Sequence, residues 1–211
     1  MDEVIVQSPS MATEVEQVLG VRARVLPFAP EIPFQGQVEP SGEEAETLRF
    51  DFVYVASGEP HKNHDRLLDA WRLLAAEGIT PSLGLTVDPD LFPDLVARIK
   101  ETAASSGLQI ENIGQASSDE IQALYRSTRA LIYPSLGESL GLPLIEAHAV
   151  GLPIIAAEKD YVRDVIDPTD TFDPCSAVSI ARAVKRFLGS PERSLAILSP
   201  REFLAAIEES R

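Results

Sequence analysis

The chain has 211 residues and a mass of 22.9 kDa, enough for one sizeable domain or for one domain with a fragment of another. Its 45% hydrophobic and 24% charged residues are typical of a globular protein and exclude disorder of the whole chain. There are 18 lysines and arginines against 33 aspartates and glutamates, so the net charge of −15 disfavours a nucleic acid or an anionic membrane as partner.

Cysteine content and apolar runs bear on the compartment. Cys175 is the only cysteine, so no disulfide forms within the chain, and a reducing, cytoplasmic environment fits best. The first residues, MDEVIVQSPS, lack the pattern of a signal peptide, and no apolar run reaches the ~18 residues of a transmembrane helix. We therefore expect a cytoplasmic protein.

Four segments differ in pattern along the chain. Residues 1–28 have the pattern of strand, helix and strand, and residues 29–49 form a linker rich in proline, glycine and glutamate. Residues 50–190 are expected to form the main domain, and residues 191–211 a C-terminal helical tail.

The N-terminal segment is amphipathic, with an apolar face at Val4, Val6, Val15 and Leu19. That face is expected to be buried on the main domain, on the C-terminal helix or on another copy of the chain. Self-association through residues 1–28 is therefore one expectation.

From residue 50 onward, apolar strands alternate with amphipathic helices. Strands are expected at 50–55, 82–87, 110–113, 130–133 and 153–156. Helices are expected at 64–75, 93–104, 141–150, 161–166, 176–188 and 200–210, with another that opens at the capping-box pair Ser117 and Glu120. This alternation predicts an α/β fold with a doubly wound, Rossmann-like parallel sheet whose ligand lies outside the carboxyl ends of the strands.

The segment YPSLGESLGLPLIEA begins at Tyr133 and has the pattern strand, glycine-containing loop, helix. A helix that begins near Gly141 presents free N–H groups and a partial positive charge, which suits an anion. The carboxylates of Glu138 and Glu146 beside it can accept hydrogen bonds from hydroxyls of the same ligand. Taken alone, the pair is more readily explained as one solvated loop glutamate and one glutamate on a helix surface.

A second segment, ASGEPHKNH, places Lys62 at the start of the next helix. An ammonium group at a helix N-terminus suits a phosphate. Without further context, a surface lysine followed by Asn63 as helix cap explains the segment better.

Together these segments resemble the retaining glycosyltransferases of the GT-B fold, family 4. The family hallmark is two glutamates separated by seven residues, which Glu138 and Glu146 match. The surrounding motif also matches, at Pro134, Ser135, Gly141, Leu142, Pro143, Ala147, Gly151 and Pro153. The resemblance covers about residues 1–190 and implies that the chain is the C-terminal, donor-binding half of such an enzyme.

The resemblance also implies roles for individual residues. Glu138 would contact hydroxyls of the donor sugar, Glu146 would hold the ribose, and Lys62 would neutralise the leaving diphosphate, which makes Lys62 and Glu138 the expected catalytic residues. The remaining expected donor-binding residues are Gly58, Gly114, Gln115, Ser139, Leu140, Gly141 and Leu142, of which Gly114 and Gln115 mark the place of the base.

The sequence departs from the family in two respects. Many members carry an arginine where this chain has Ser57, and His61 could replace its charge in part. The acceptor-binding half has no counterpart here, so residues 1–28 are expected to be a remnant of that N-terminal domain.

The expected function is transfer of a sugar, with retention, from a nucleotide-diphosphate sugar to an acceptor saccharide or lipid-linked saccharide. The nucleotide sugar is a substrate, and no cofactor or metal is expected. The missing N-terminal domain is the expected protein partner, with contact at the inner face of a membrane as a further option through that domain. The alternatives are a non-catalytic nucleotide-sugar-binding or assembly module, and a GT-B-like sugar-nucleotide epimerase.

Overall fold

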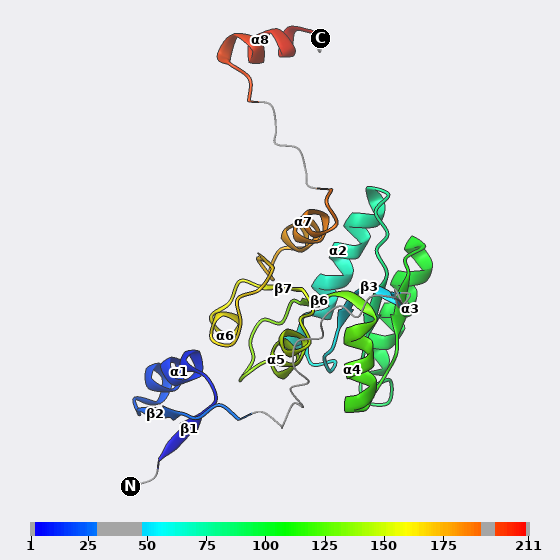
Figure 1. Ribbon diagram of the computed structural model, residues 1–211. Helices are drawn as coiled ribbons and strands as arrows, with labels where there is room; N and C mark the ends of the chain where they lie inside the picture. The colour runs from blue at the N-terminus through cyan, green and yellow to red at the C-terminus, as the bar shows by residue number, and fades with distance from the viewer. Residues whose placement is uncertain (1–2, 29–47, 191–196, 210–211) are drawn as a thin grey trace.

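The computed structural model describes residues 3–28, 48–190 and 197–209. Its main sheet has six parallel strands in the order β5-β4-β3-β6-β7-β8 (Figure 1). The strands of this sheet are β3 (Phe50–Tyr54), β4 (Leu83–Leu85), β5 (Ile110–Asn112), β6 (Thr128–Tyr133), β7 (Ile154–Ala157) and β8 (Asp170–Phe172). The doubly wound α/β fold expected from the sequence is confirmed.

Helices connect the strands and cover both faces of the sheet (Figure 1). They are η1 (Pro60–Lys62, a 3-10 turn), α2 (His64–Ala76), α3 (Pro93–Ser106), α4 (Ser118–Arg126), α5 (Leu142–Ala149), α6 (Asp160–Arg163) and α7 (Ala177–Phe187). The last helix, α8 (Pro200–Glu209), follows the sheet in the sequence and does not cover it. α2 contacts both α3 and α7, whereas α4 and α5 pack on β6. The expected capping box is present, because Ser117 and Glu120 each bond the other's backbone N–H at the start of α4.

The strand order reverses between β3 and β6, which are neighbours in the sheet although the strands β4 and β5 lie between them in the sequence. At such a reversal the loops after the two strands diverge to opposite faces and leave a crevice. The loops that follow β3 and β6 contain Lys62 and Glu138. The topology therefore brings both expected catalytic residues to one crevice.

The core lies on both faces of this sheet. Phe52 on β3 and Trp71 on α2 are fully buried, and their rings meet edge to face at 5.7 Å. The indole N–H of Trp71 donates to the carbonyl of Pro81 at 2.9 Å, so no polar atom of this side chain is left unsatisfied. Trp71 is thus a core residue, as its helical spacing indicates.

Residues 3–28, the N-terminal unit, lie outside the main sheet. β1 (Val4–Val6) and β2 (Ala23–Val25) pair in parallel, and α1 (Pro9–Leu19) connects them. α1 contacts α6, where the backbone N–H of Ser10 donates to Asp164 at 2.9 Å. That this unit is the remnant of another domain stays a prediction.

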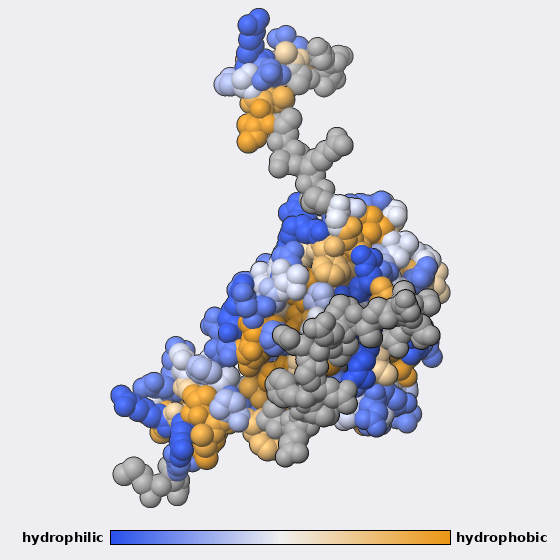
Figure 2. Space-filling view, in the orientation of Figure 1, coloured by the Kyte–Doolittle hydropathy of each residue, from blue (hydrophilic) through white to orange (hydrophobic). Residues whose placement is uncertain are grey.

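Burial of the unit's apolar face is found only in part. Val6 is 5% exposed, but Leu19 remains 65% exposed. Figure 2 shows apolar side chains at the surface of this unit and of α8, which lies apart from the sheet. Leu19 is therefore not buried within the described residues of a single chain, and its burial on another copy stays a prediction.

Several expected boundaries differ from the structure. The strand β8 was not expected from the sequence, and the helix expected at 161–166 is the single turn α6. The linker at 29–49 and the tail at 191–211 lie largely or partly outside the described residues. None of the helices in the described ranges combines the length and the apolar character needed to cross a bilayer.

Candidate functional site

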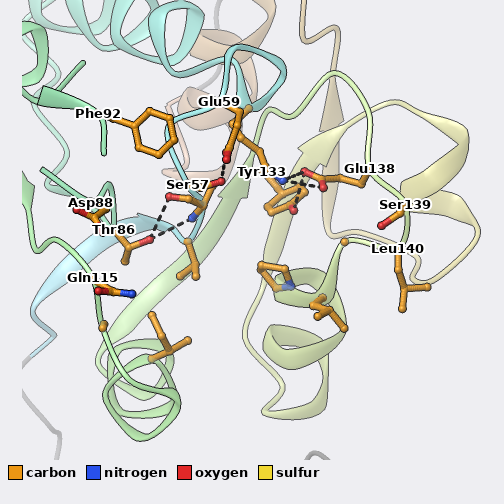
Figure 3. A pocket seen from close by; sticks show the side chains of 18 of the residues that line it. Ser57, Glu59, Thr86, Asp88, Phe92, Gln115, Tyr133, Glu138, Ser139 and Leu140 are labelled. Atoms are coloured by element: carbon orange, nitrogen blue, oxygen red, sulfur yellow. Dashed lines mark hydrogen bonds and ion pairs between the residues drawn. The ribbon is translucent and has the colours of Figure 1, made fainter. Parts of the chain in front are cut away.

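A cavity of about 710 Å³ opens at the carboxyl ends of β3, β4 and β6 (Figure 3). Its position is the crevice at the strand-order reversal. The expected site residues that line it are Lys62, Gln115, Glu138, Ser139, Leu140, Gly141 and Leu142. These side chains come from three loops that are separated in the sequence, and the fold brings them together.

Three expected site residues do not line this cavity. Gly58 and Gly114 lie directly beside lining residues, and Glu146 lies on α5 behind the wall. Gly114 has φ of +84°, a left-handed conformation that glycine adopts without strain. The roles in donor binding assigned to these residues stay predictions.

Lys62 and Glu138 form a close ion pair at the cavity. The Lys62 Nζ lies 2.8 Å from both carboxylate oxygens of Glu138. The two side chains are only 15% and 9% exposed. Lys62 is therefore not a solvated surface lysine, and the pair has less solvent screening than an exposed one.

Hydrogen bonds fasten the Lys62 loop to the Glu138 loop. The carbonyl of His61 accepts from the backbone N–H of Leu136 at 2.8 Å and from the Ser135 hydroxyl at 3.2 Å. The side-chain amide of Asn63 donates to the carbonyls of Pro134 at 3.0 Å and Pro174 at 2.8 Å. These bonds fix the separation of Lys62 and Glu138 through the backbone.

Asn63 follows the 3-10 turn η1 and has φ of +63°. It occupies the N-cap position of α2, as expected, but its side chain makes no capping bond because it bonds the two neighbouring loops instead. The conformation of Asn63 thus ends η1 at Lys62 and starts α2 at His64.

Two buried tyrosines lie beneath the ion pair. The Tyr133 hydroxyl donates to Glu138 Oε1 at 3.0 Å, and the Tyr54 hydroxyl donates to the backbone carbonyl of Lys62 at 2.9 Å. Burial first, then the neighbouring Tyr54 and Glu138, raises the pKa of Tyr133 well above its usual value, so its hydroxyl stays a donor. At the sequence level Tyr133 is one more apolar strand residue, and nothing distinguishes it from the core.

The N-terminus of α5 forms another part of the wall. Gly141 has φ of +72°, and a Cβ at this position would lie 3.0 Å from Leu144 Cδ1. Glycine therefore suits this turn both by conformation and by space. Gly141, Leu142 and Pro143 line the cavity, which puts the positive end of the α5 dipole beside it.

The opposite wall is built by the loops after β3 and β4. Thr86 Oγ1 accepts from the backbone N–H of Ala56 at 3.1 Å, and the Ser57 hydroxyl bonds Glu59. The Phe92 ring packs so closely on Gly58 that a Cβ there would lie 2.3 Å from Phe92 Cγ. This contact explains why a glycine stands at position 58, which the sequence alone does not reveal.

The cavity is acidic overall. Lys62 is the only lysine or arginine among its described lining residues, and three carboxylates face it, those of Glu59, Asp88 and Glu138. His61 is exposed and absent from the lining, so the expected replacement of the missing arginine by His61 finds no support. Positive charge for an anionic ligand comes from Lys62 and the α5 N-terminus.

Glu146 has one described side-chain partner, the hydroxyl of Tyr125 on α4, which donates to its Oε2 at 3.2 Å. Burial raises the pKa of Glu146, and the Tyr125 hydrogen bond opposes this in part. Among the described residues, none donates a hydrogen bond to the other carboxylate oxygen. In the parts of the chain that the structure describes, no group of three or more histidine, cysteine, aspartate or glutamate side chains is placed to hold a metal ion.

Gln7 and Phe28 from the N-terminal unit also line the cavity. Sequence reasoning assigned no site role to either residue. Phe28 is 72% exposed, so it adds an exposed aromatic side chain to a lining that already contains Phe92 and Leu91.

Comparison with known proteins places residues 39–198 in a family model described as glycosyl transferases group 1. Among curated proteins, the serotype-specific mannosyltransferase WbdA of Escherichia coli is 28% identical over 200 residues, which are 89% of this chain and 24% of that protein. The chain thus spans about a quarter of the length of this relative.

Solved structures share the fold. A glycosyltransferase from Rickettsia africae superposes with a TM-score of 0.72 at 18% identity, covering 89% of this chain and 53% of that one. HepE from Anabaena, solved with UDP and glucose, gives a TM-score of 0.70 at 19% identity, covering 88% and 53%. The GT-B type of the fold expected from the sequence is therefore confirmed.

Proposed function

The chain belongs to the family of glycosyl transferases group 1, and on that premise we propose that residues 50–190 bind the donor of a retaining glycosyltransferase of family 4. The donor is a nucleotide-diphosphate sugar, and the acceptor is a saccharide or a lipid-linked saccharide. The observation that carries this proposal is the meeting of Lys62, Glu138 and the α5 N-terminus in one cavity. The UDP and glucose bound by HepE support the class of ligand.

In the proposed reaction, the bond between the anomeric carbon and the diphosphate oxygen breaks. The acceptor oxygen bonds that carbon from the same face, and its proton leaves with the diphosphate. Negative charge grows on the diphosphate, where Lys62 and the N–H groups near Gly141 stabilise it. In the free protein the Lys62 ammonium bonds Glu138. A bound diphosphate therefore either shares this ammonium with Glu138 or replaces Glu138 as its partner.

Glu138 and Glu146 act in this proposal by positioning rather than by proton transfer. Glu138 accepts hydrogen bonds from the donor sugar, and Glu146 accepts them from the ribose through its free oxygen. The base packs at the loop of Gly114 and Gln115, beside the start of α4. No metal cofactor enters the proposal, since Lys62 and α5 already supply positive charge at the diphosphate.

The acceptor requires further protein surface. The cavity walls described here come from the donor-side loops, and only Gln7 and Phe28 approach from the N-terminal unit. We propose that an acceptor-binding domain completes the site on that side, in the cytoplasm or at the inner face of a membrane.

The experiment that tests donor binding is an amide chemical-shift titration of this chain with UDP-glucose and GDP-mannose. Binding at the proposed site shifts the amides of Lys62, Gly137 and Gly141, and Lys62→Met abolishes the effect. Shifts confined to another surface would contradict the proposal. Product formed with an added acceptor domain then reports retention by the anomeric coupling in its spectrum, whereas binding without any transfer would favour the non-catalytic module.

A further inference from the structure

Tyr133 is the last residue of β6, is 1% exposed, and contributes to the lining of the cavity. Its hydroxyl donates the third described hydrogen bond to the Glu138 carboxylate, and the other two come from Lys62 Nζ. Figure 3 shows the Tyr133 side chain beside the Glu138 carboxylate, with dashed lines that mark the contacts of this carboxylate.

The contacts of Glu138 in the free protein conflict with the proposed donor complex. A diphosphate attracts Lys62, and any turn of the ammonium toward phosphate weakens its two bonds to Glu138. Among the hydrogen bonds found for Glu138, the one from Tyr133 is the only one that such a turn leaves intact. We propose that Tyr133 is a positioning residue that holds Glu138 toward the donor sugar when Lys62 engages the diphosphate; this inference rests on the proposed function.

The surroundings of Tyr133 suit this role. Its ring meets Tyr54 edge to face at 5.4 Å and Tyr161 at 6.5 Å, so packing fixes the direction of the hydroxyl. Tyr54 in turn holds the backbone carbonyl of Lys62. Lys62 and Glu138 are therefore anchored by separate tyrosines, and one can move without releasing the other.

This arrangement predicts an effect that depends on the sugar. Glu138 is proposed to contact the sugar and not the nucleotide, so Tyr133 stabilises complexes that carry a sugar. Loss of its hydroxyl lowers the affinity for a nucleotide sugar more than the affinity for the free nucleoside diphosphate. The ratio of the two dissociation constants separates this role from a general loss of stability.

The test compares Tyr133→Phe with Tyr161→Phe. Both variants remove one buried hydroxyl from the same aromatic cluster, and Tyr161 donates to the Ser135 carbonyl at 2.8 Å rather than to Glu138. Dissociation constants are measured by chemical-shift titration for UDP-glucose against UDP and for GDP-mannose against GDP. For the pair that the unchanged chain binds, Tyr133→Phe is expected to reduce the preference for the sugar roughly five- to tenfold, and Tyr161→Phe to leave it unchanged.

A Glu138→Gln variant distinguishes failure of the role of Tyr133 from failure of the proposed function. If Glu138→Gln reduces the sugar preference and Tyr133→Phe does not, the role of Tyr133 is overturned while the proposed function stands. Equal losses in Tyr133→Phe and Tyr161→Phe also overturn it, because they indicate a structural effect. If Glu138→Gln leaves the preference unchanged, or the unchanged chain binds neither pair, the proposed function fails and the inference fails with it.

Discussion

Replacing Gly58 by alanine tests how the loop after β3 is shaped. The added Cβ would lie 2.3 Å from Phe92 Cγ, 2.7 Å from Cδ1 and 2.8 Å from Cβ. Rotation of the ring cannot relieve all three contacts, because the Phe92 Cβ is fixed by the backbone at the start of α3. Either the Gly58 loop or the start of α3 has to shift.

Forced overpacking of this kind costs about 2 kcal/mol. For a chain of this size, that loss lowers the thermal midpoint by roughly 4–8 °C. Circular dichroism melting and urea unfolding measure both quantities. Because Ser57 and Glu59 beside Gly58 line the cavity, nucleotide binding should weaken as well.

Gly137→Ala is the matched control in the other cavity loop. A Cβ at Gly137 meets nothing within 4 Å, so the melting point of the Gly137→Ala variant should stay within about 1 °C of that of the unchanged chain. In a Phe92→Ala background, Gly58→Ala should cost much less, since the clashing ring is absent. An undiminished cost in that background, or no cost in either, would refute the reasoning.

Three further predictions concern titration, the ribose and catalysis. Burial lowers the pKa of His64 below its ordinary 6.5, so the unfolded chain takes up a proton more readily than the folded one. The free energy of unfolding should therefore fall as the pH drops below about 6.5. In urea unfolding from pH 5 to 8, this free energy should depend less on pH in His64→Gln. Glu146→Gln should weaken UDP or GDP binding about tenfold in calorimetry with little change in melting point, and unchanged affinity would mean that the ribose is held elsewhere. The chain alone should bind nucleotides weakly and transfer sugar poorly or not at all, because Lys62 is the single lysine or arginine among the described lining residues. Binding should be equal in EDTA, since Lys62 and the α5 N-terminus are proposed to supply the positive charge. Robust transfer without an acceptor domain, or a need for a divalent ion, would contradict this.

The strands that hold the site could be predicted because their residues form continuous apolar runs. β3 was expected at 50–55 and β6 at 130–133, and each end lies within two residues of the observed one. β8 was not, since Asp170–Phe172 is short, mostly polar and bonded only at the sheet edge beside β7. Its strand conformation depends on a neighbour rather than on its own pattern.

The site was predictable in its residues but not in its contacts. The motif placed Lys62 and Glu138 in one site, yet no pattern in the sequence indicated that they bond each other across 76 positions. The sequence likewise gave no sign of the hydrogen bond from Tyr133 to Glu138 or of the packing of Phe92 on Gly58. They arise where separate loops converge, and local sequence carries no signal of that.

The central pairing of the sheet has a consequence for how the domain is made. Phe50 on β3 lies opposite Thr128 on β6, so the strand next to β3 on that side is synthesised 78 positions later. Because synthesis proceeds at about 5–20 residues per second, the edge of β3 that pairs with β6 stays unpaired for roughly 4–16 s during synthesis. Contacts of such long range make folding slow, and during this interval the unpaired edge of β3 is open to pairing with other chains.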